Sequence, residues 1–426
     1  MKRILSLLVV VCHLCFLSAQ IRGNEIRVVV SPDHTDWVYD LNKPCTFTVR
    51  VVKAQNLLPD VRVDYELGPE MYPTETKKGV VLKDGTLKLR STMKTPGFLR
   101  CKVKAYVGDK TYEGLATAAY APDRLKPLSQ LPEDFQAYWA ETLKKARELP
   151  LNPVMELLPE RCTETDNVYQ VSYQVKPGGG RYYGILSIPK KEGKYPALLR
   201  VPGAGVRPYT GDTYTAPGKV ITLEVGVHGI PVTMEQSVYD ALANGALNNY
   251  WTFRYDDRDA FYYNRVIVGA LRGVDLLCSL PQYNGKALGV TGSSQGGALS
   301  IITAALDPRV TFLAAVHPAL CDHEAYFQKR ACGWPHYFYY YGDRDKEVRE
   351  TLRYYDTSNF ARFIRVPGWY SWGYNDEVCP PTTTYATYNI ITAPKELHPY
   401  LETGHYWYQE QWDAWQAWIR KQLGIE

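Results

Sequence analysis

Apolar and polar residues alternate over short runs in the first part of the chain. Between residues 25 and about 121 these runs recur at roughly ten-residue spacing. The runs are EIRVVVSP, CTFTVRVVKA, VRVDYEL, GVVLKDGTLKLRSTM, GFLRCKVKAYV and KTYEGLATAAYAP. Period-two alternation predicts half-buried strands, and the Asp84–Gly85 pair is typical of a hairpin turn. The pattern therefore predicts a small all-β, immunoglobulin-like sandwich over residues 20–122.

The pattern changes at the proline-containing segment PDRLKPLSQLPEDFQ, residues 122–136. A helix is expected to start near residues 132–134, because apolar residues then follow at helical spacing. These residues are Phe135, Tyr138, Trp139, Leu143 and Ala146. We place a second domain over residues 123–426.

Strand-like and helix-like runs alternate through this second domain. The strand runs are VYQVSYQV, RYYGILSIP, YPALLRVPG, KVITLEVGV, KALGVTG, VTFLAAVHP and VPGWYSWG. Between and after them lie the helical runs RDAFYYNRVIVGALRGVDLLCSL and SQGGALSIITAAL and a final helix rich in tryptophan. This alternation predicts a mostly parallel sheet with helices on both faces.

The first nineteen residues differ from both patterns. They have a basic start at Lys2 and Arg3, an apolar middle and a small-residue end at Ser18–Ala19. This order is typical of a secretory signal peptide, so we expect residues 1–19 to be removed and the protein to be exported to the periplasm or beyond. Cys12, His13 and Cys15 interrupt the short apolar stretch, which argues against a membrane anchor.

Charge and cysteine content narrow the picture further. The mature chain would hold 47 basic and 45 acidic residues with no basic stripe, so nucleic acid is not an expected partner. It would keep seven cysteines, of which Cys45 and Cys101 are candidates for a bridge between two sheets. In the mature chain no cysteine or histidine cluster has metal-site spacing, so no metal or cofactor is expected. The 34 tyrosines would suit a sugar or peptide ligand, although most of them are expected to fill strands and loop cores.

The stretch GSSQGG, residues 292–297, carries the first sign of chemistry. It fits the G-x-S-x-G pattern only with Ser294 at the centre; an apolar strand precedes it and an amphipathic helix follows. A sharp strand-to-helix turn lifts such a serine to the carboxyl edge of a parallel sheet, as in the α/β-hydrolase fold. Ser293 would face away and pack. We therefore predict Ser294 as a nucleophile.

A serine nucleophile needs a base and an acid, which follow it in the order acid, then histidine, in this fold. The downstream histidines are His317, His323, His336, His398 and His405. We predict His405 as the base because it lies on a glycine-containing loop just before the last helix. His398 is the alternative base, and we expect His317 and His323 to pack or to line a pocket.

The candidate acid is Asp376, in GYNDEVCPP directly after an apolar strand. A carboxylate there can orient the base and stabilise the imidazolium. Asp343 and Asp345 compete for this role, but they are typical of solvated acids at a helix start.

These motifs resemble the acetyl xylan esterase and cephalosporin-C deacetylase family, carbohydrate esterase family seven. The resemblance covers residues from about 130 to 423 and is carried by LPEDFQAYW, GSSQGG, DEVCPP and GHYW. It implies an α/β-hydrolase fold with Ser294, Asp376 and His405 as the triad. It also implies an oxyanion hole made by the backbone N–H groups of Gln295 and, in RVPGAG, Ala204.

Three positions depart from the family pattern. Pro202–Gly203–Ala204 stands where the family has His-Gly-Tyr, and His228–Gly229 where it has Arg-Gly-Gln. Tyr406 follows the histidine where the family usually has glutamate. The first two lie at the rim of the site and leave the exact substrate open. None removes a triad member.

We therefore expect a secreted serine esterase that removes acetyl groups from xylan, xylo-oligosaccharides or related sugars. Two alternatives are a secreted serine peptidase of the same fold and a catalytically altered, glycan-binding hydrolase homologue. Family members often form rings, so a homo-oligomer is one expectation. The added β domain could block or redirect that assembly.

Overall fold

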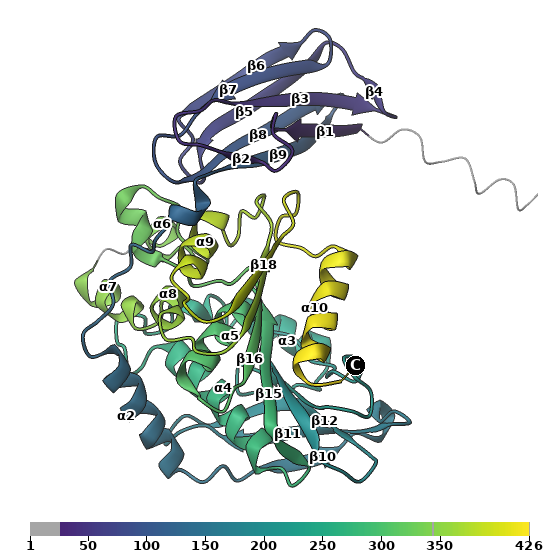
Figure 1. Ribbon diagram of the computed structural model, residues 1–426, viewed down its shortest axis with the longest axis vertical. Coiled ribbons are helices and arrows are strands. Elements are labelled where there is room, and N and C mark those ends of the chain that lie inside the picture. Colours follow the sequence, from purple (N-terminus) through teal and green to yellow (C-terminus); the bar gives the residue numbers. More distant parts are fainter. Residues whose placement is uncertain (1–25, 343–344, 426) are drawn as a thin grey trace, which may run out of the picture. The chain divides into compact units, whose positions relative to one another are not determined.

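The computed structural model describes residues 26–342 and 345–425 (Figure 1). It divides into two compact units, Met1–Ala121 and Pro122–Glu426. This division falls one residue before the boundary placed from sequence. The predicted signal peptide, residues 1–19, lies outside the described residues. Within the described part, no helix combines the length and apolar character that crossing a membrane requires.

The N-terminal unit consists of two sheets. One holds β1 (Ile26–Ser31), β3 (Cys45–Lys53), β4 (Asn56–Leu57) and β7 (Thr86–Ser91). The other holds, in spatial order, β2 (Val38–Tyr39), β9 (Lys110–Tyr120), β8 (Gly97–Val107), β5 (Val61–Pro69) and β6 (Glu75–Leu82). Alternate residues of β3 and β8, such as Phe47 and Val103, are fully buried. The predicted all-β architecture is confirmed.

Cys45 and Cys101 come from opposite sheets of this unit, β3 and β8. Both are fully buried and both are free thiols, so the bridge considered from sequence is not formed. Burial raises the pKa of each thiol to about 12. Since the thiolate is the reactive form, these two thiols are inert in the folded unit.

The C-terminal unit is built on one nine-stranded sheet. Its spatial order is β10-β11-β12-β14-β13-β15-β16-β17-β18. β10 (Val154–Leu157), β11 (Asp166–Gln174) and β12 (Arg181–Pro189) pair antiparallel, and β12 also pairs antiparallel with β14 (Ile221–Gly226). The remaining pairs are parallel and join β14, β13 (Tyr195–Arg200), β15 (Tyr283–Ser293), β16 (Phe312–Val316), β17 (Gly368–Trp372) and β18 (Lys395–Pro399).

Helices cover both faces of this sheet, as Figure 1 shows for α5 and α10. α5 (Gln295–Leu306) packs on β15 and β16, and ten of its twelve residues are buried. α10 (Gln409–Gln422) covers the other face, where its Trp415 and Trp418 pack with Phe312 and Trp369. Sheet strands buried on both faces read as continuous apolar runs, which is why the sequence revealed the central strands. The predicted α/β-hydrolase class is confirmed.

The other helical segments connect the strands. They are η1 (Pro122–Arg124), α2 (Phe135–Glu148), η2 (Pro159–Arg161), α3 (Gln236–Asn244), η3 (Tyr250–Thr252), α4 (Tyr262–Ser279), η4 (His323–Gln328), α6 (Tyr337–Tyr340), α7 (Lys346–Arg353), α8 (Thr357–Ala361) and α9 (Pro381–Asn389). The loops after β13, β15, β16, β17 and β18 emerge at one edge of the sheet, because parallel strands end on the same side. The candidate catalytic residues lie on these loops.

Candidate active site

Ser294 occupies the turn between β15 and α5, in the strained conformation φ 61° and ψ −122°. This region is unfavourable for a residue with a side chain and persists only where the surroundings enforce it. A side chain at Gly292 or at Gly296 would put its Cβ 2.3 Å or 2.2 Å from the Val201 carbonyl oxygen. The glycines therefore let the end of β13 pack against the turn, and this packing holds Ser294 in place.

Asp376 and His405 meet at the same edge of the sheet. The Asp376 side chain is fully buried and accepts hydrogen bonds from the backbone N–H groups of Val378 and Cys379, both at 2.8 Å. His405 Nδ1 lies 2.8 Å from Asp376 Oδ2. Burial alone would raise the pKa of Asp376, but the hydrogen bond from His405 and the nearby charges outweigh burial and lower it.

The ionised Asp376 fixes the tautomer of His405. A carboxylate can only accept hydrogen bonds, so the proton of a neutral imidazole stays on Nδ1. Nε2 of His405 then carries the free lone pair that a general base requires. Its side chain keeps 24% of its surface exposed, which leaves this atom within reach of a substrate.

His317 is a third polar side chain at this point, and sequence reasoning expected it only to pack or to line a pocket. The register between β15 and β16 pairs Ser293 with Val316, which places His317 beside the turn. Its Nε2 lies 2.6 Å from Ser293 Oγ, and its ring centroid lies 4.3 Å from that of His405. Ser293, expected to pack, therefore forms a specific hydrogen bond.

Burial lowers the pKa of His317 to about 3, and the positive charge that His405 can carry contributes to this shift. His317 is consequently neutral beside the base. Its Nδ1 is buried and has no hydrogen-bond partner among the described residues. A neutral imidazole packed against the His405 ring excludes water from that side and limits how the base can rotate.

The loop after β13 carries the second predicted oxyanion donor, Ala204. A Cβ on the neighbouring Gly203 would lie 3.3 Å from the Ser293 carbonyl oxygen and 3.8 Å from Ser294 Cβ, so the loop lies against the turn. Arg207 donates from Nη1 to the Ala204 carbonyl at 2.8 Å and from Nη2 to the Gly203 carbonyl at 3.1 Å. The loop carbonyls are thus held by a guanidinium group.

His228, one of the departures from the family pattern, supports the same loop. Its Nε2 lies 2.9 Å from the Gly205 carbonyl oxygen and its Nδ1 lies 2.8 Å from the Tyr262 hydroxyl. Burial lowers the pKa of His228 to about 4. The neutral ring therefore donates from Nε2 to the carbonyl and accepts from the tyrosine.

Gln295 has two parts that matter. Its backbone N–H belongs to the first turn of α5, where N–H groups have no partner within the helix and can bind developing negative charge. Its buried side-chain amide accepts hydrogen bonds from the hydroxyls of Tyr250 at 2.6 Å and Tyr263 at 2.7 Å. The amide nitrogen faces the Pro202 carbonyl oxygen at 3.4 Å. Sequence reasoning used only the backbone group, although a buried glutamine at the start of an apolar helix is itself a signal of side-chain hydrogen bonding.

Among the described residues, His317, Asp376 and His405 form one group of metal-ligand type, with ligand atoms within 4.8 Å of one another. His405 Nδ1 and Asp376 Oδ2 are hydrogen-bonded to each other, so a metal there would have to break that pair. Tyr406, which follows the histidine, is half exposed and brings no carboxylate.

The turn serine, the buried aspartate and the loop histidine lie where the α/β-hydrolase fold carries its catalytic residues. The comparisons specify the family. The model of the acetyl xylan esterase (AXE1) family matches residues 123–421, so the chain belongs to this family. Its class is that of the serine hydrolases that act on acetyl esters.

Individual proteins similar to this chain are also acetyl esterases or acetyl xylan esterases. Acetyl esterase Axe7A from Xylanibacter ruminicola is 38% identical over 400 residues, which cover 92% of this chain and 90% of that protein. Acetyl xylan esterase from Paenibacillus sp. R4 has 25% identity and a TM-score of 0.61 over 70% of this chain and 98% of that one. Acetyl Xylan Esterase 1 from Thermoanaerobacterium sp. JW/SL YS485 shares the fold, with 24% identity and a TM-score of 0.59 over 71% and 97%.

The matches cover the two units of this chain to different extents. The two solved structures are matched almost in full yet account for only about 70% of this chain. The match to Axe7A is longer than the C-terminal unit and therefore extends into the N-terminal β unit. The sequence similarity to this relative thus includes residues of the β unit.

Proposed function

We propose that this protein is a secreted serine esterase that removes acetyl groups from acetylated xylan, xylo-oligosaccharides or related sugars. The observation that carries the mechanism is the hydrogen bond between His405 and the buried Asp376, at the sheet edge where Ser294 occupies its strained turn. Membership of the acetyl xylan esterase family supports the acetyl ester as substrate.

In the proposed first step, Ser294 Oγ attacks the acetyl carbonyl carbon and its proton passes to His405 Nε2. The carbonyl oxygen gains a full negative charge in the tetrahedral intermediate. The backbone N–H groups of Gln295 and Ala204 would bind it, and loss of one such donor typically lowers the rate by about 10²–10³.

The intermediate collapses when the bond to the sugar oxygen breaks and His405 returns its proton to that oxygen. Asp376 stays ionised and stabilises the imidazolium between the two transfers. Water then attacks the acetyl-enzyme by the same route, which releases acetate and restores the Ser294 hydroxyl. An alkoxide leaves more readily than an amine, which favours esters over peptides.

The test compares acetate release from acetylated xylo-oligosaccharides by the wild type and by Ser294→Ala. We expect a loss of more than about 10⁴-fold in kcat, as when the nucleophile of a serine hydrolase is removed. Equal rates would sink the proposal. Dipeptide amides as a parallel substrate test the peptidase alternative, and labelling by a fluorophosphonate probe tests a glycan-binding protein without catalysis.

We also propose that the protein is exported. The support is the amino-terminal sequence with its basic start, apolar middle and small residues before position 20. Mass measurement of the protein purified from cell fractions should find a chain beginning at Gln20 in the periplasmic or extracellular fraction. A full-length chain in the cytoplasmic fraction would contradict this.

A further inference from the structure

Two tryptophans that the proposed mechanism does not use lie together, with partly exposed rings. Trp251 belongs to η3, and Trp334 precedes α6 along the chain. Their ring centroids are 5.2 Å apart, with an interplanar angle of 61°. The Trp251 Nε1–H group donates to the Tyr341 hydroxyl at 2.7 Å, and Tyr341 is itself 38% exposed.

The first tryptophan is fixed next to the oxyanion residue. Tyr250 precedes it in the chain and donates its hydroxyl to the Gln295 side chain at 2.6 Å. The Tyr337 hydroxyl donates to the Trp251 carbonyl at 2.8 Å. Both tyrosines are almost fully buried and hold the backbone of Trp251, which is itself only partly buried.

The second tryptophan reaches the same point by a separate route. The Leu320 N–H donates to the Trp334 carbonyl at 2.8 Å, and the neighbouring Ala319 N–H donates to the Ser294 carbonyl at 3.0 Å. Two independent sets of hydrogen bonds therefore connect the pair of indoles to the turn that carries the nucleophile. Residues far apart in the sequence converge there.

We propose that Trp251, Trp334 and Tyr341 form an aromatic subsite that binds the sugar ring next to the acetylated unit. This inference rests on the proposed function, since it names the part of the protein that would recognise a carbohydrate substrate. A sugar ring presents apolar C–H groups on its faces and hydroxyls at its rim. Partly exposed indoles can stack on the faces of the sugar, and the Tyr341 hydroxyl can hydrogen-bond to the hydroxyls at its rim.

A purely apolar ligand fits the subsite less well. The Tyr341 hydroxyl accepts from the Trp251 indole, and such a ligand would cover the rest of its hydrogen-bonding capacity without compensation. A carbohydrate can hydrogen-bond to this edge while it stacks on the rings. The hydrogen bonds that connect this site to the Ser294 turn favour the substrate itself, rather than a separate partner, as the occupant.

The kinetic test uses two substrates of different size. p-Nitrophenyl acetate offers the ester without a sugar, whereas acetylated xylo-oligosaccharides offer both. For Trp251→Ala we expect KM for the oligosaccharide to rise about tenfold more than KM for p-nitrophenyl acetate, because one aromatic contact is lost. Trp251→Phe should restore part of this difference.

Tyr195→Ala is the matched control. Tyr195 begins β13 and so lies at the opposite edge of the sheet, where its hydroxyl bonds to the Lys191 carbonyl. It should not change the ratio of the two KM values. Equal losses of Trp251→Ala on both substrates would show a merely structural role, and no change on the oligosaccharide would show no role. Either result overturns the subsite.

A binding experiment separates this inference from the proposed function. Titration calorimetry of unacetylated xylohexaose into Ser294→Ala needs no reaction, and we expect Kd to rise about tenfold when Trp251→Ala is added. If the wild type releases no acetate from oligosaccharides, the proposed function fails while this measurement still reports on the subsite. No binding of xylohexaose, or the same Kd in both variants, overturns the subsite itself.

Discussion

The two ends of helix α5 satisfy their polar groups in opposite ways. At its N-terminal end Ser294 holds an unfavourable backbone conformation, and the neighbouring His317 has a buried ring nitrogen without a partner among the described residues. Both features cost folding free energy. They persist at the point where the proposed chemistry needs a positioned hydroxyl and a restrained base.

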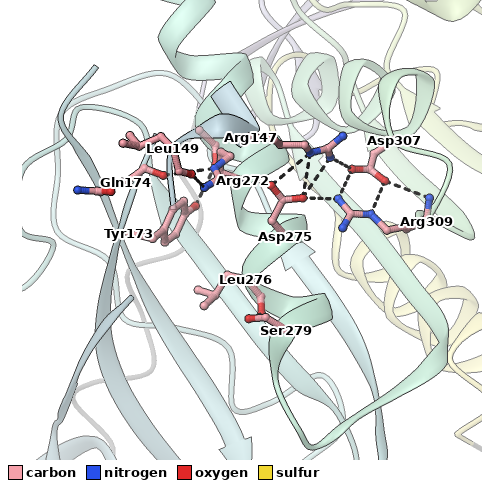
Figure 2. Close-up of polar contacts among 11 residues, drawn as sticks. Arg147, Leu149, Tyr173, Gln174, Arg272, Asp275, Leu276, Ser279, Asp307 and Arg309 are labelled. Carbon is pink, nitrogen blue, oxygen red and sulfur yellow. Dashed lines mark hydrogen bonds and ion pairs between the residues drawn. The ribbon is translucent and has the colours of Figure 1, made fainter. Parts of the chain in front are cut away.

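At the C-terminal end the charges are paired several times over. Asp307, fully buried, accepts from Arg147 Nη2 at 2.7 Å and from Arg309 Nη2 at 2.6 Å. Asp275 of α4 pairs with the same two arginines and with Arg272 at 2.7 Å. Figure 2 shows these two carboxylates bridged by the guanidinium groups of Arg147 and Arg309.

The two ends of α5 thus have different roles: one end carries the proposed nucleophile, and the other end stabilises the position of the helix. The ion-pair network joins α2, α4 and the end of α5, and so holds the helix whose other end carries the nucleophile. In α5 the unfavourable backbone geometry lies at the end where chemistry is proposed, while the carboxylate at the other end is paired with two arginines. Substitutions at the two ends should therefore affect different properties.

The largest expected effect is on catalysis, from Asp376→Asn near the N-terminal end. The amide cannot stabilise an imidazolium and favours the wrong tautomer of His405, so kcat should fall about 10⁴-fold. The free energy of unfolding, measured in urea, should change far less than the activation free energy that corresponds to this loss of kcat. Steady-state kinetics with p-nitrophenyl acetate measure the loss, and a kcat within tenfold of the wild type would remove Asp376 from the triad.

The second effect is on stability, from Asp307→Asn at the C-terminal end. The amide loses the charge that pairs with Arg147 and Arg309, although both arginines are partly exposed and keep Asp275 as a partner, so the change should cost about 2 kcal/mol of unfolding free energy. Urea denaturation followed by tryptophan fluorescence measures this, since all tryptophans except Trp37 lie in the C-terminal unit.

Glu141→Gln is the control for this stability effect. Glu141 lies 3.6 Å from Lys145 and half of its side chain is exposed, so its loss should cost less than about 0.5 kcal/mol. A similar small cost for Asp307→Asn, or a large loss of kcat in that variant, would break the division between the two ends.

The sequence revealed the central architecture because the strands next to the turn are mostly apolar where they are buried. β16 is buried along its whole length and β15 over residues 288–292, and these buried segments stand out as apolar runs. The edge strands β10 and β18 were missed because they lack such an apolar run. β10 is exposed along its whole length, and β18 reads KELHP, with only partial burial. His398, the alternative base, lies in β18, because backbone pairing with β17 forms this strand without an apolar pattern.

The candidate site was only partly predictable, for a related reason. Ser294 and the loops of Asp376 and His405 are marked by local patterns of glycine, proline and apolar residues. The partners of Gln295 and the position of His317 depend on sheet register and on tyrosines about thirty to forty-five residues away. Short-range patterns do not encode such contacts, so they required the structure.

The third prediction concerns pH. Burial lowers the pKa of His228, His317 and His336 to about 4, 3 and 4, whereas an unfolded histidine titrates near 6.5. Their contribution to stability is complete above pH 6.5 and is lost as pH falls toward these values. At pH 5 each should cost about 2 kcal/mol, because the unfolded chain binds one more proton per histidine.

His317→Asn tests this and also sharpens the contrast between the two ends. It should remove about 2 kcal/mol of the stability difference between pH 7.5 and pH 5, as measured by urea denaturation at both values. The wild type, measured in parallel, gives the reference value of that difference. The same pH dependence in His317→Asn and in the wild type would show that His317 is not held neutral by burial.

The smallest expected effect distinguishes the two adjacent serines. Ser293→Ala removes the hydroxyl 2.6 Å from His317 Nε2 and leaves that buried ring without either hydrogen bond. The unfolding free energy should fall by about 1 kcal/mol, the usual cost of one unsatisfied buried group. Because Ser293 only supports the ring beside His405, kcat should fall less than about tenfold, against more than about 10⁴-fold for Ser294→Ala. Kinetics and urea denaturation of the two variants side by side provide the measurement, and a collapse of kcat in Ser293→Ala with full labelling of Ser294→Ala by a fluorophosphonate would reverse the assignment of the nucleophile.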